Sequence, residues 1–256
     1  MATIKKQFLA LSLTFVNLCF GANLAELERA CKARNSNACV SLADKHYNAK
    51  DYIKAKSYIA KACDLDNANG CAKLAVLYNY NYSDFKQDVL LAKRYYGKAC
   101  LLSKHQKPCD EYRRIAEFKP EIDEVDRQIC ASNDFSGALS ALACFNIGYI
   151  YDKKEKNPNI AKDYYKQACD LKNKRRNKNA CANLGFLYIN ERNLIEAKIY
   201  FEHACSLIES VACNALGIMY KDGYGVKKDI EKAKFYYQKA CEYGDTNTCE
   251  KLKEFK

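Results

Sequence analysis

Apolar and polar residues recur along this chain with the spacing of amphipathic helices. Segments that end in Ala-Cys, such as AKRYYGKAC (92–100) and AKIYFEHAC (197–205), carry alanine at i and i+7 and an aromatic residue at i+3 or i+4. Those positions share one face of a helix. Segments that begin at a later cysteine, such as CANLGFLY (181–188) and CNALGIMY (213–220), repeat leucine and tyrosine at helical spacing. The pattern predicts an all-α chain in which two kinds of helix alternate.

Two features of these segments concern the packing between helices. Gly148, Gly185 and Gly217 fall inside the second kind of helix, where glycine lowers helix stability, so we expect close helix contacts there. Adjacent tyrosines recur in the first kind: Tyr95 with Tyr96, Tyr164 with Tyr165 and Tyr236 with Tyr237. Neighbouring helix positions point about 100° apart. One ring of each pair is expected in the core and the other at the edge of a concave groove, unless both fill the space between helices.

The cysteines give the length of the repeat. Seven consecutive pairs have first members 30 to 39 residues apart, which is the length of a helix-turn-helix unit. The pairs are Cys31 with Cys39, Cys63 with Cys71, Cys100 with Cys109, Cys130 with Cys144, Cys169 with Cys181, Cys205 with Cys213 and Cys241 with Cys249. Antiparallel helices joined by a tight loop bring one helix end and the next helix start within disulfide reach, so pairing of sequence neighbours is the simplest of many connectivities.

This layout predicts a right-handed αα-solenoid of about seven repeats over residues 22–256, with one disulfide per repeat. One helix should end near the first cysteine of a pair, and the next should start near the second cysteine after a short polar loop. The stretch 110–143 is irregular, because it lacks the Ala-Lys-x-Tyr-Tyr helix and spaces Cys130 and Cys144 widely. We expect a bend or joint in the solenoid there.

Residues 1–21 indicate an exported protein. Lys5 and Lys6 precede the apolar run FLALSLTFVNLCF (8–20), which is typical of a secretory signal peptide and short for a membrane span. Removing Cys19 with this leader leaves 14 of the 15 cysteines, an even number that suits disulfides. Leu18 before Cys19 is a poor match to a lipidation site.

Charge narrows the class of partner. The formal charge of +11 falls to +9 when the two leader lysines are removed. We expect a secreted or periplasmic monomer without a membrane span, which binds a protein or peptide, most simply an acidic one, and no nucleic acid. The alternative is that the excess positive charge only keeps the protein soluble.

The helical segments resemble a known repeat. The Ala-Lys-x-Tyr-Tyr-x-Lys-Ala-Cys motif, the Leu-Gly-x-x-Tyr stretch after the second cysteine, and KDGYGVKKDIEKA (221–233) are similar to the Sel1-like repeat, a relative of the tetratricopeptide repeat. The resemblance covers residues 24–256 and is strongest to the exported Helicobacter cysteine-rich proteins. It implies an αα-solenoid that mediates protein interactions. The Gly-x-Gly loop of the repeat is intact only once, at Gly223 and Gly225.

The same resemblance implies an alternative activity, because that branch is described as penicillin-binding and as weakly active on lactams. A serine β-lactamase needs a serine with a lysine one helical turn away, together with Ser-Asp-Asn and Lys-Thr-Gly elements. Ser83 and Lys86 fit the first spacing, but the other two elements are absent. A zinc site needs clustered ligands, whereas His46, His105 and His203 lie in separate repeats. The sequence therefore favours a binding scaffold without cofactor or metal over an enzyme, and a weak β-lactamase is the alternative.

The candidate contact residues lie where the chain departs most from its own repeat, between residues 110 and 180. The basic run KNKRRNK (172–178) is interpreted as part of a long loop between Cys169 and Cys181, and such loops often carry function. A solvated loop without a partner is the alternative. The residues expected to attract an acidic ligand are Lys174, Arg175, Arg176 and Lys178, with Tyr164 or Tyr165 adding apolar contact.

The incomplete motif set predicts no efficient lactam turnover. Pure protein without residues 1–21 should hydrolyse the chromogenic lactam nitrocefin no faster than a heat-denatured sample, because Ser83 and Lys86 lack the other catalytic elements. Robust hydrolysis that Ser83→Ala or Lys86→Ala abolishes would contradict this prediction.

Overall fold

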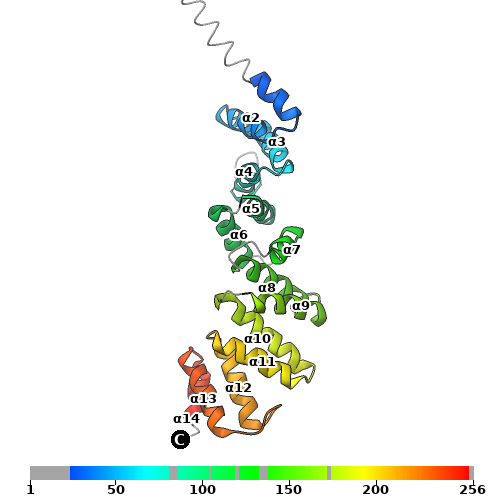
Figure 1. Ribbon diagram of the computed structural model, residues 1–256. Coiled ribbons are helices and arrows are strands. Elements are labelled where there is room, and N and C mark those ends of the chain that lie inside the picture. The colour runs from blue at the N-terminus through cyan, green and yellow to red at the C-terminus, as the bar shows by residue number, and fades with distance from the viewer. Residues whose placement is uncertain are drawn as a thin grey trace, which may run out of the picture. The chain divides into compact units, whose positions relative to one another are not determined.

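The computed structural model describes residues 24–80, 86–103, 105–118, 121–132, 138–171 and 174–253, without the side chains of residues 118 and 174–176. These residues form helices joined by short turns and contain no β-strand (Figure 1). A helix over residues 24–32 comes first. It is followed by α2 (Ser36–Asn48), α3 (Tyr52–Asp64), α4 (Ala68–Asn79), α5 (Val89–Ser103), α6 (Gln106–Phe118), α7 (Glu124–Ala131), α8 (Ala138–Lys153), α9 (Pro158–Asp170), α10 (Lys174–Asn190), α11 (Leu194–Ser206), α12 (Ser210–Asp222), α13 (Ile230–Glu242) and α14 (Thr246–Lys253).

The polar residues between the helical segments cap the helices. A cap side chain that accepts a hydrogen bond from a first-turn N–H satisfies a donor that the helix itself leaves free. Asn67 accepts from the N–H of Gly70 at 3.0 Å, and Asp229 accepts from that of Lys232 at 3.0 Å. The same role falls to Asn35, Asp51, Asp123, Asn157 and Asn193. The short connections are therefore fixed by local hydrogen bonds as well as by the cysteines.

Seven disulfides join the predicted neighbours, one per repeat. They bond Cys31 to Cys39, Cys63 to Cys71, Cys100 to Cys109, Cys130 to Cys144, Cys169 to Cys181, Cys205 to Cys213 and Cys241 to Cys249. Their Cα atoms lie 4.5–5.0 Å apart, and each bond links the last turn of one helix to the following helix.

Most of the second cysteines lie inside the first turns of their helices and not at a helix start. Cys39 is the fourth residue of α2, Cys109 the fourth of α6 and Cys213 the fourth of α12. Cys71 and Cys249 are likewise the fourth residues of α4 and α14, so the prediction that a helix starts near the second cysteine is correct to within one turn at five positions. One turn of helix places the sulfur of each beside the end of the preceding helix.

The disulfides join helices that belong to different packed pairs. The helices of the pairs α2/α3, α4/α5, α8/α9, α10/α11 and α12/α13 pack against each other most extensively. Each disulfide therefore joins one such pair to a neighbouring helix, as between α3 and α4 or between α11 and α12.

The wider cysteine spacings do not produce long loops, which corrects the interpretation of the basic run. Helix α10 already begins at Lys174, so residues 174–178 are helical and Cys181 lies two turns inside the helix. Helix α8 likewise begins at Ala138, six residues before Cys144. Extra residues continue the helix in the N-terminal direction, because each added residue gains a backbone hydrogen bond that a loop would leave to water.

The three predicted glycines are sites of close helix contact. A Cβ atom built on Gly148 would lie 2.8 Å from the ring of Tyr165, and one on Gly185 would lie 2.7 Å from Phe201. On Gly217 it would lie 2.4 Å from two ring atoms of Tyr237. In the first repeat the corresponding positions hold Ala43 and Ile59, which are both buried in one cluster. In this pair Ala43, which is larger than glycine, is matched by Ile59, which is smaller than tyrosine or phenylalanine.

One tyrosine of each pair lies in the core, as predicted, and the other contacts a neighbouring helix; its place at the edge of a groove stays a prediction. The second member of each pair, Tyr96, Tyr165 or Tyr237, is buried in the core. The first member is half-buried and stacks on an aromatic residue of the preceding helix. The stacked pairs are Tyr78–Tyr95, Tyr151–Tyr164, Tyr188–Tyr200 and Tyr220–Tyr236, with ring planes 1–9° apart.

The chain divides into two compact units, and the boundary between them in the sequence lies between Ile115 and Ala116, within α6. This boundary falls inside the stretch 110–143 that the sequence marks as irregular, and α7 there has only 8 residues. In the parts of the chain that the structure describes, no helix has the length and apolar character needed to cross a membrane. The predicted signal peptide over residues 1–21 and the side chain of Ser83 lie outside the described residues.

The contact between Gly217 and Tyr237 predicts a reciprocal pair of substitutions. Gly217→Ala should lower the free energy of unfolding by about 1–2 kcal/mol, because overpacking costs about 1–3 kcal/mol and the gain in helix propensity returns at most about 1 kcal/mol. Adding Tyr237→Ile recreates the pairing of Ala43 with Ile59, so the double variant should be more stable than either single variant. Urea unfolding followed by circular dichroism measures this, and additive effects would contradict the close contact.

Candidate binding cleft

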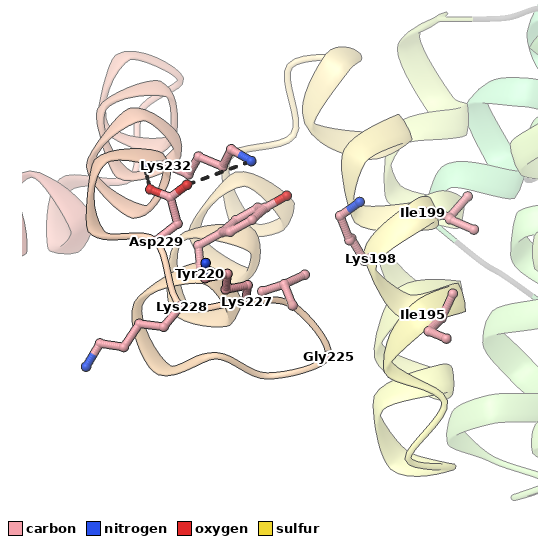
Figure 2. A pocket seen from close by; sticks show the side chains of 10 residues that line it. Ile195, Lys198, Ile199, Tyr220, Gly225, Lys227, Lys228, Asp229 and Lys232 are labelled. Carbon is pink, nitrogen blue, oxygen red and sulfur yellow. Dashed lines mark hydrogen bonds and ion pairs between the residues drawn. The ribbon is translucent and has the colours of Figure 1, made fainter.

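A cleft of about 740 Å³ lies in the second unit, between α11 and the segment that connects α12 to α13. Helix α11 contributes Ile195, Lys198 and Ile199. The opposite side is formed by the following residues: Tyr220, Gly225, Val226, Lys227, Lys228, Asp229 and Lys232. Figure 2 shows Lys198 projecting from α11 towards Tyr220 and the connecting segment. The cleft thus combines one helix with the segment that contains the intact Gly-x-Gly loop.

Gly225 places this loop against α11. It has a φ of +67°, and a Cβ atom built on it would lie 2.4 Å from Cβ of Leu194, the first residue of α11. A Cβ of Leu194 is fixed by the helix backbone and cannot move aside. Gly223 also has a positive φ, of +80°, but a Cβ there would meet no atom closer than 3.6 Å. The loop therefore needs glycine at 223 for backbone conformation alone, and at 225 also for contact with the helix.

Positive charge dominates the lining of the cleft. Four lysines face one aspartate. Lys198 pairs with Glu202 at 3.1 Å within α11, and Lys232 pairs with Asp229 at 3.8 Å. Within the described ranges, no acidic side chain forms an ion pair with Lys227 or Lys228, and both side chains are exposed. These two lysines are available to an anionic ligand.

Two isoleucines add apolar surface to α11. Ile195 is 69% exposed and Ile199 is 48% exposed, and both extend from a different face of the helix than Lys198 does (Figure 2). The core face of α11 is supplied by Ala197, Phe201 and Ala204. In α9 the register positions of the two isoleucines are occupied by Asn159 and Asp163. Helix α3 has the exposed Ile53 at the position of Ile195 but Ser57 at that of Ile199, so it is the pair of exposed isoleucines that distinguishes α11.

Tyr220 is a nearly buried residue of the cleft lining. Its ring stacks on Tyr236 with centroids 5.5 Å apart, and the Nζ atom of Lys232 lies 5.2 Å above it. Burial raises the pKa of Tyr236, and the charge of Glu202 and the neighbouring Tyr220 raise it further. This tyrosine therefore stays neutral at physiological pH and adds no negative charge beside the basic cleft.

The residues singled out from the sequence lie elsewhere. Tyr165 is fully buried with its hydroxyl 3.4 Å from Asp152, so it cannot touch a partner, which corrects its assignment as a contact residue. Tyr164 is half-buried in its stack with Tyr151. Lys178 donates to the carbonyl of Ile208 at 2.9 Å and pairs with Glu209 at 3.2 Å, which links α10 to the start of α12. The side chains of Lys174, Arg175 and Arg176 are outside the description, and their role stays a prediction.

The sequence carries a signal for the cleft that lies outside the repeat pattern. Ile195 and Ile199 fall off the Ala-aromatic-Ala face of their helix, and Lys227 and Lys228 follow the one intact Gly-x-Gly loop. What the sequence did not show is that this loop folds back on α11, because that contact joins residues about 30 positions apart.

One group of potential metal ligands occurs in the described part of the chain. Donor atoms of Cys169, Cys181 and His203 lie within 4.8 Å of one another. Both sulfur atoms are bonded to each other, so they cannot act as thiolate ligands in this oxidation state. Lys86 is exposed ahead of α5, and its suggested partner Ser83 is outside the described residues.

Comparisons with known proteins agree with the architecture. The Sel1 repeat model matches residues 49–67, 68–104 and 210–245, and a tetratricopeptide repeat model matches residues 141–175 and 179–210. The chain therefore carries Sel1 and tetratricopeptide-like repeats. The matches at 68–104 and 210–245 span α4 with α5 and α12 with α13, so in this frame each disulfide joins consecutive repeats.

Curated relatives and a solved structure extend these matches. HcpC of Helicobacter pylori, provisionally named a β-lactamase, is 37% identical over 78 residues, which are 30% of this chain and 24% of HcpC. HcpA of the same species, named a β-lactamase, is 41% identical over 49 residues, or 19% of this chain and 20% of HcpA. The matched segments thus span a quarter or less of these relatives. The Escherichia coli protective antigen c5321, which has an SLR fold, is 18% identical with a TM-score of 0.50 over 90% of this chain and 50% of that one, a likeness in fold alone.

The contact between the loop and α11 can be tested with two glycine variants, of which only one disturbs that contact. Gly225→Ala should open the cleft, because its methyl group meets Leu194, whereas Gly223→Ala only strains the backbone. We expect faster backbone hydrogen exchange over residues 194–197 and 223–229 in Gly225→Ala, and an increase confined to the loop in Gly223→Ala. Equal exchange in both variants would show that the contact with Leu194 does not hold the loop.

Proposed function

We propose that this chain of Sel1 and tetratricopeptide-like repeats is an exported scaffold that binds an acidic, aliphatic segment of a partner protein in the cleft of α11. The observation that carries this proposal is that the free Lys227 and Lys228 and the exposed Ile195 and Ile199 line the same cleft. Repeat proteins of this architecture present extended surfaces to other proteins.

The charge of the cleft selects the sign of the ligand. Lys227 and Lys228 have no acidic partner among the described residues and sit beside Lys198 and Lys232. Carboxylates of a partner would satisfy these cations at the surface, where the attraction speeds association and weakens in salt. A basic segment would meet like charges on the same side of the cleft.

The exposed isoleucines favour a ligand that carries aliphatic side chains. Large aliphatic side chains that are half or more exposed lose contact with water when a partner covers them, and burial contributes about 25 cal/mol per Å². A purely anionic ligand such as a free phosphate would leave Ile195 and Ile199 uncovered. A peptide that alternates carboxylates with leucine, isoleucine or valine uses both features of the cleft.

The chemistry of the chain supports export. Seven disulfides persist most readily outside the reducing cytosol. We propose a signal peptide at residues 1–21 and a periplasmic or secreted location. The lactam alternative draws only on the names of the relatives, and the described residues add nothing to it, so it is not proposed as the function.

Selection from a display library of random short peptides tests the proposed ligand class. The enriched peptides should carry net negative charge together with aliphatic residues. Fluorescence anisotropy with one labelled peptide should show binding that weakens in salt and falls about tenfold or more in Lys227→Glu/Lys228→Glu. The control is Lys154→Glu/Lys156→Glu, which makes the same charge change at exposed positions between α8 and α9, away from the cleft.

The contribution of the two isoleucines to peptide binding is tested with a separate control. Ile195→Ser/Ile199→Ser should weaken the same peptide, whereas Ile53→Ser, at the register position of Ile195 in α3 and 72% exposed, should not. Enrichment of neutral or basic peptides, or equal loss in the cleft and control variants, would refute this function.

A further inference from the structure

The residue two positions before the first cysteine of a pair lies over a disulfide in the second unit. Oε1 of Gln167 is 3.4 Å from Sγ of Cys130 and 4.0 Å from Sγ of Cys144, the preceding disulfide. His203 occupies the same position one repeat later. Its Nδ1 is 3.5 Å from Sγ of Cys169 and 3.6 Å from Sγ of Cys181.

His203 is unusual among the residues at this position. The others before the second to seventh pairs are lysine or glutamine: Lys61, Lys98, Gln128, Gln167 and Lys239. Imidazole is the side chain whose ordinary pKa lies nearest to neutrality, so imidazole can both hold and release a proton near pH 7. Glutamine at the same place cannot transfer a proton.

From this geometry we infer that Cys169–Cys181 is a reactive disulfide, cleaved by an external dithiol with His203 as the proton donor. A thiolate of the dithiol attacks one sulfur, and a new mixed disulfide forms as the Cys169–Cys181 bond breaks. The electron pair leaves on the other cysteine, which takes a proton from the imidazolium of His203. The second thiol of the dithiol then resolves the mixed disulfide, so the dithiol is oxidised by two electrons and both cysteines are reduced.

The position of Nδ1 suits this step. It is nearly equidistant from both sulfur atoms, so whichever cysteine leaves has the imidazole beside it. A neighbouring cation lowers the pKa of a thiol, and a leaving thiol of lower pKa departs faster. His203 is itself exposed, so its ring can recover a proton from solvent after each transfer.

The structure also provides a matched comparison for reactivity. Cys169 and Cys181 are 1% and 0% exposed, and Cys130 and Cys144 are 6% and 0% exposed. The Cys130–Cys144 disulfide beneath Gln167 is therefore at least as accessible to a thiol as the Cys169–Cys181 disulfide. A faster reaction of the pair beneath His203 must come from chemistry and not from exposure.

Limited reduction of the oxidised protein tests the inference. Dithiothreitol, a dithiol, is added at pH 7 in limiting amount, thiols are trapped with iodoacetamide over time, and each cysteine pair is quantified by peptide mapping. Cys169–Cys181 should be reduced about tenfold faster than Cys130–Cys144. His203→Gln should remove this advantage, and Gln167→His should transfer it to Cys130–Cys144.

The direction of the effect separates chemistry from stability. A His203→Gln variant that merely loosens the fold would expose the disulfide and speed its reduction, whereas the inference requires slower reduction. Melting curves from circular dichroism compare the stabilities of the variants. Equal reduction rates of the two pairs in the natural protein, or an unchanged or faster rate in His203→Gln, would overturn the assignment.

Discussion

The covalent bond between the end of one helix and the start of the next sets the geometry on which the rest of this chain depends. With Cα atoms 4.5–5.0 Å apart, each disulfide places a helix such as α12 against the end of α11. Four residues beyond Cys213, the small Gly217 then receives the ring of Tyr237 from the following helix. A helix of this kind is thus held by a bond on one side and by close packing on the other, so each repeat is positioned by contacts with its neighbours.

Most of the fold was readable from the sequence because its determinants are local. The cysteine period, the Ala-aromatic-Ala face and the capping residues each involve positions within one or two helices. The glycines could be assigned to close contacts because glycine in a helix has a cost that packing must offset. The interpretation of residues 174–178 as part of a loop was wrong because it relied on the cysteine spacing. Cysteine spacing alone does not distinguish a long loop from a helix that starts earlier, and α10 starts earlier.

The candidate cleft was harder to foresee than the helices that form it. Lys227 and Lys228 are visible in the sequence, but they line a cleft only because Gly225 contacts Leu194. These two residues are separated in the sequence by α12. Ile195 and Ile199 read as apolar residues of a helix, and only their position relative to Ala197 and Phe201 reveals that they face away from the core. The buried Tyr165 shows the converse: two adjacent tyrosines look equivalent in the sequence, and packing against Gly148 assigns one of them to the interior.

The placement of the disulfides also determines how the chain responds to proteolytic nicking. Each bond encloses a short segment between residues 8 to 14 positions apart, so a protease that cuts inside Cys63–Cys71 leaves two fragments that remain covalently joined. The connections within the helix pairs are enclosed by no such bond among the described residues. A single cut in the 223–229 loop leaves α13 and α14 with no covalent link to the residues before them, since Cys241 and Cys249 are bonded only to each other. The edge of the repeat that forms the cleft is therefore also the edge at which one cleavage can divide the protein, and a ligand seated there would shield that bond from the protease.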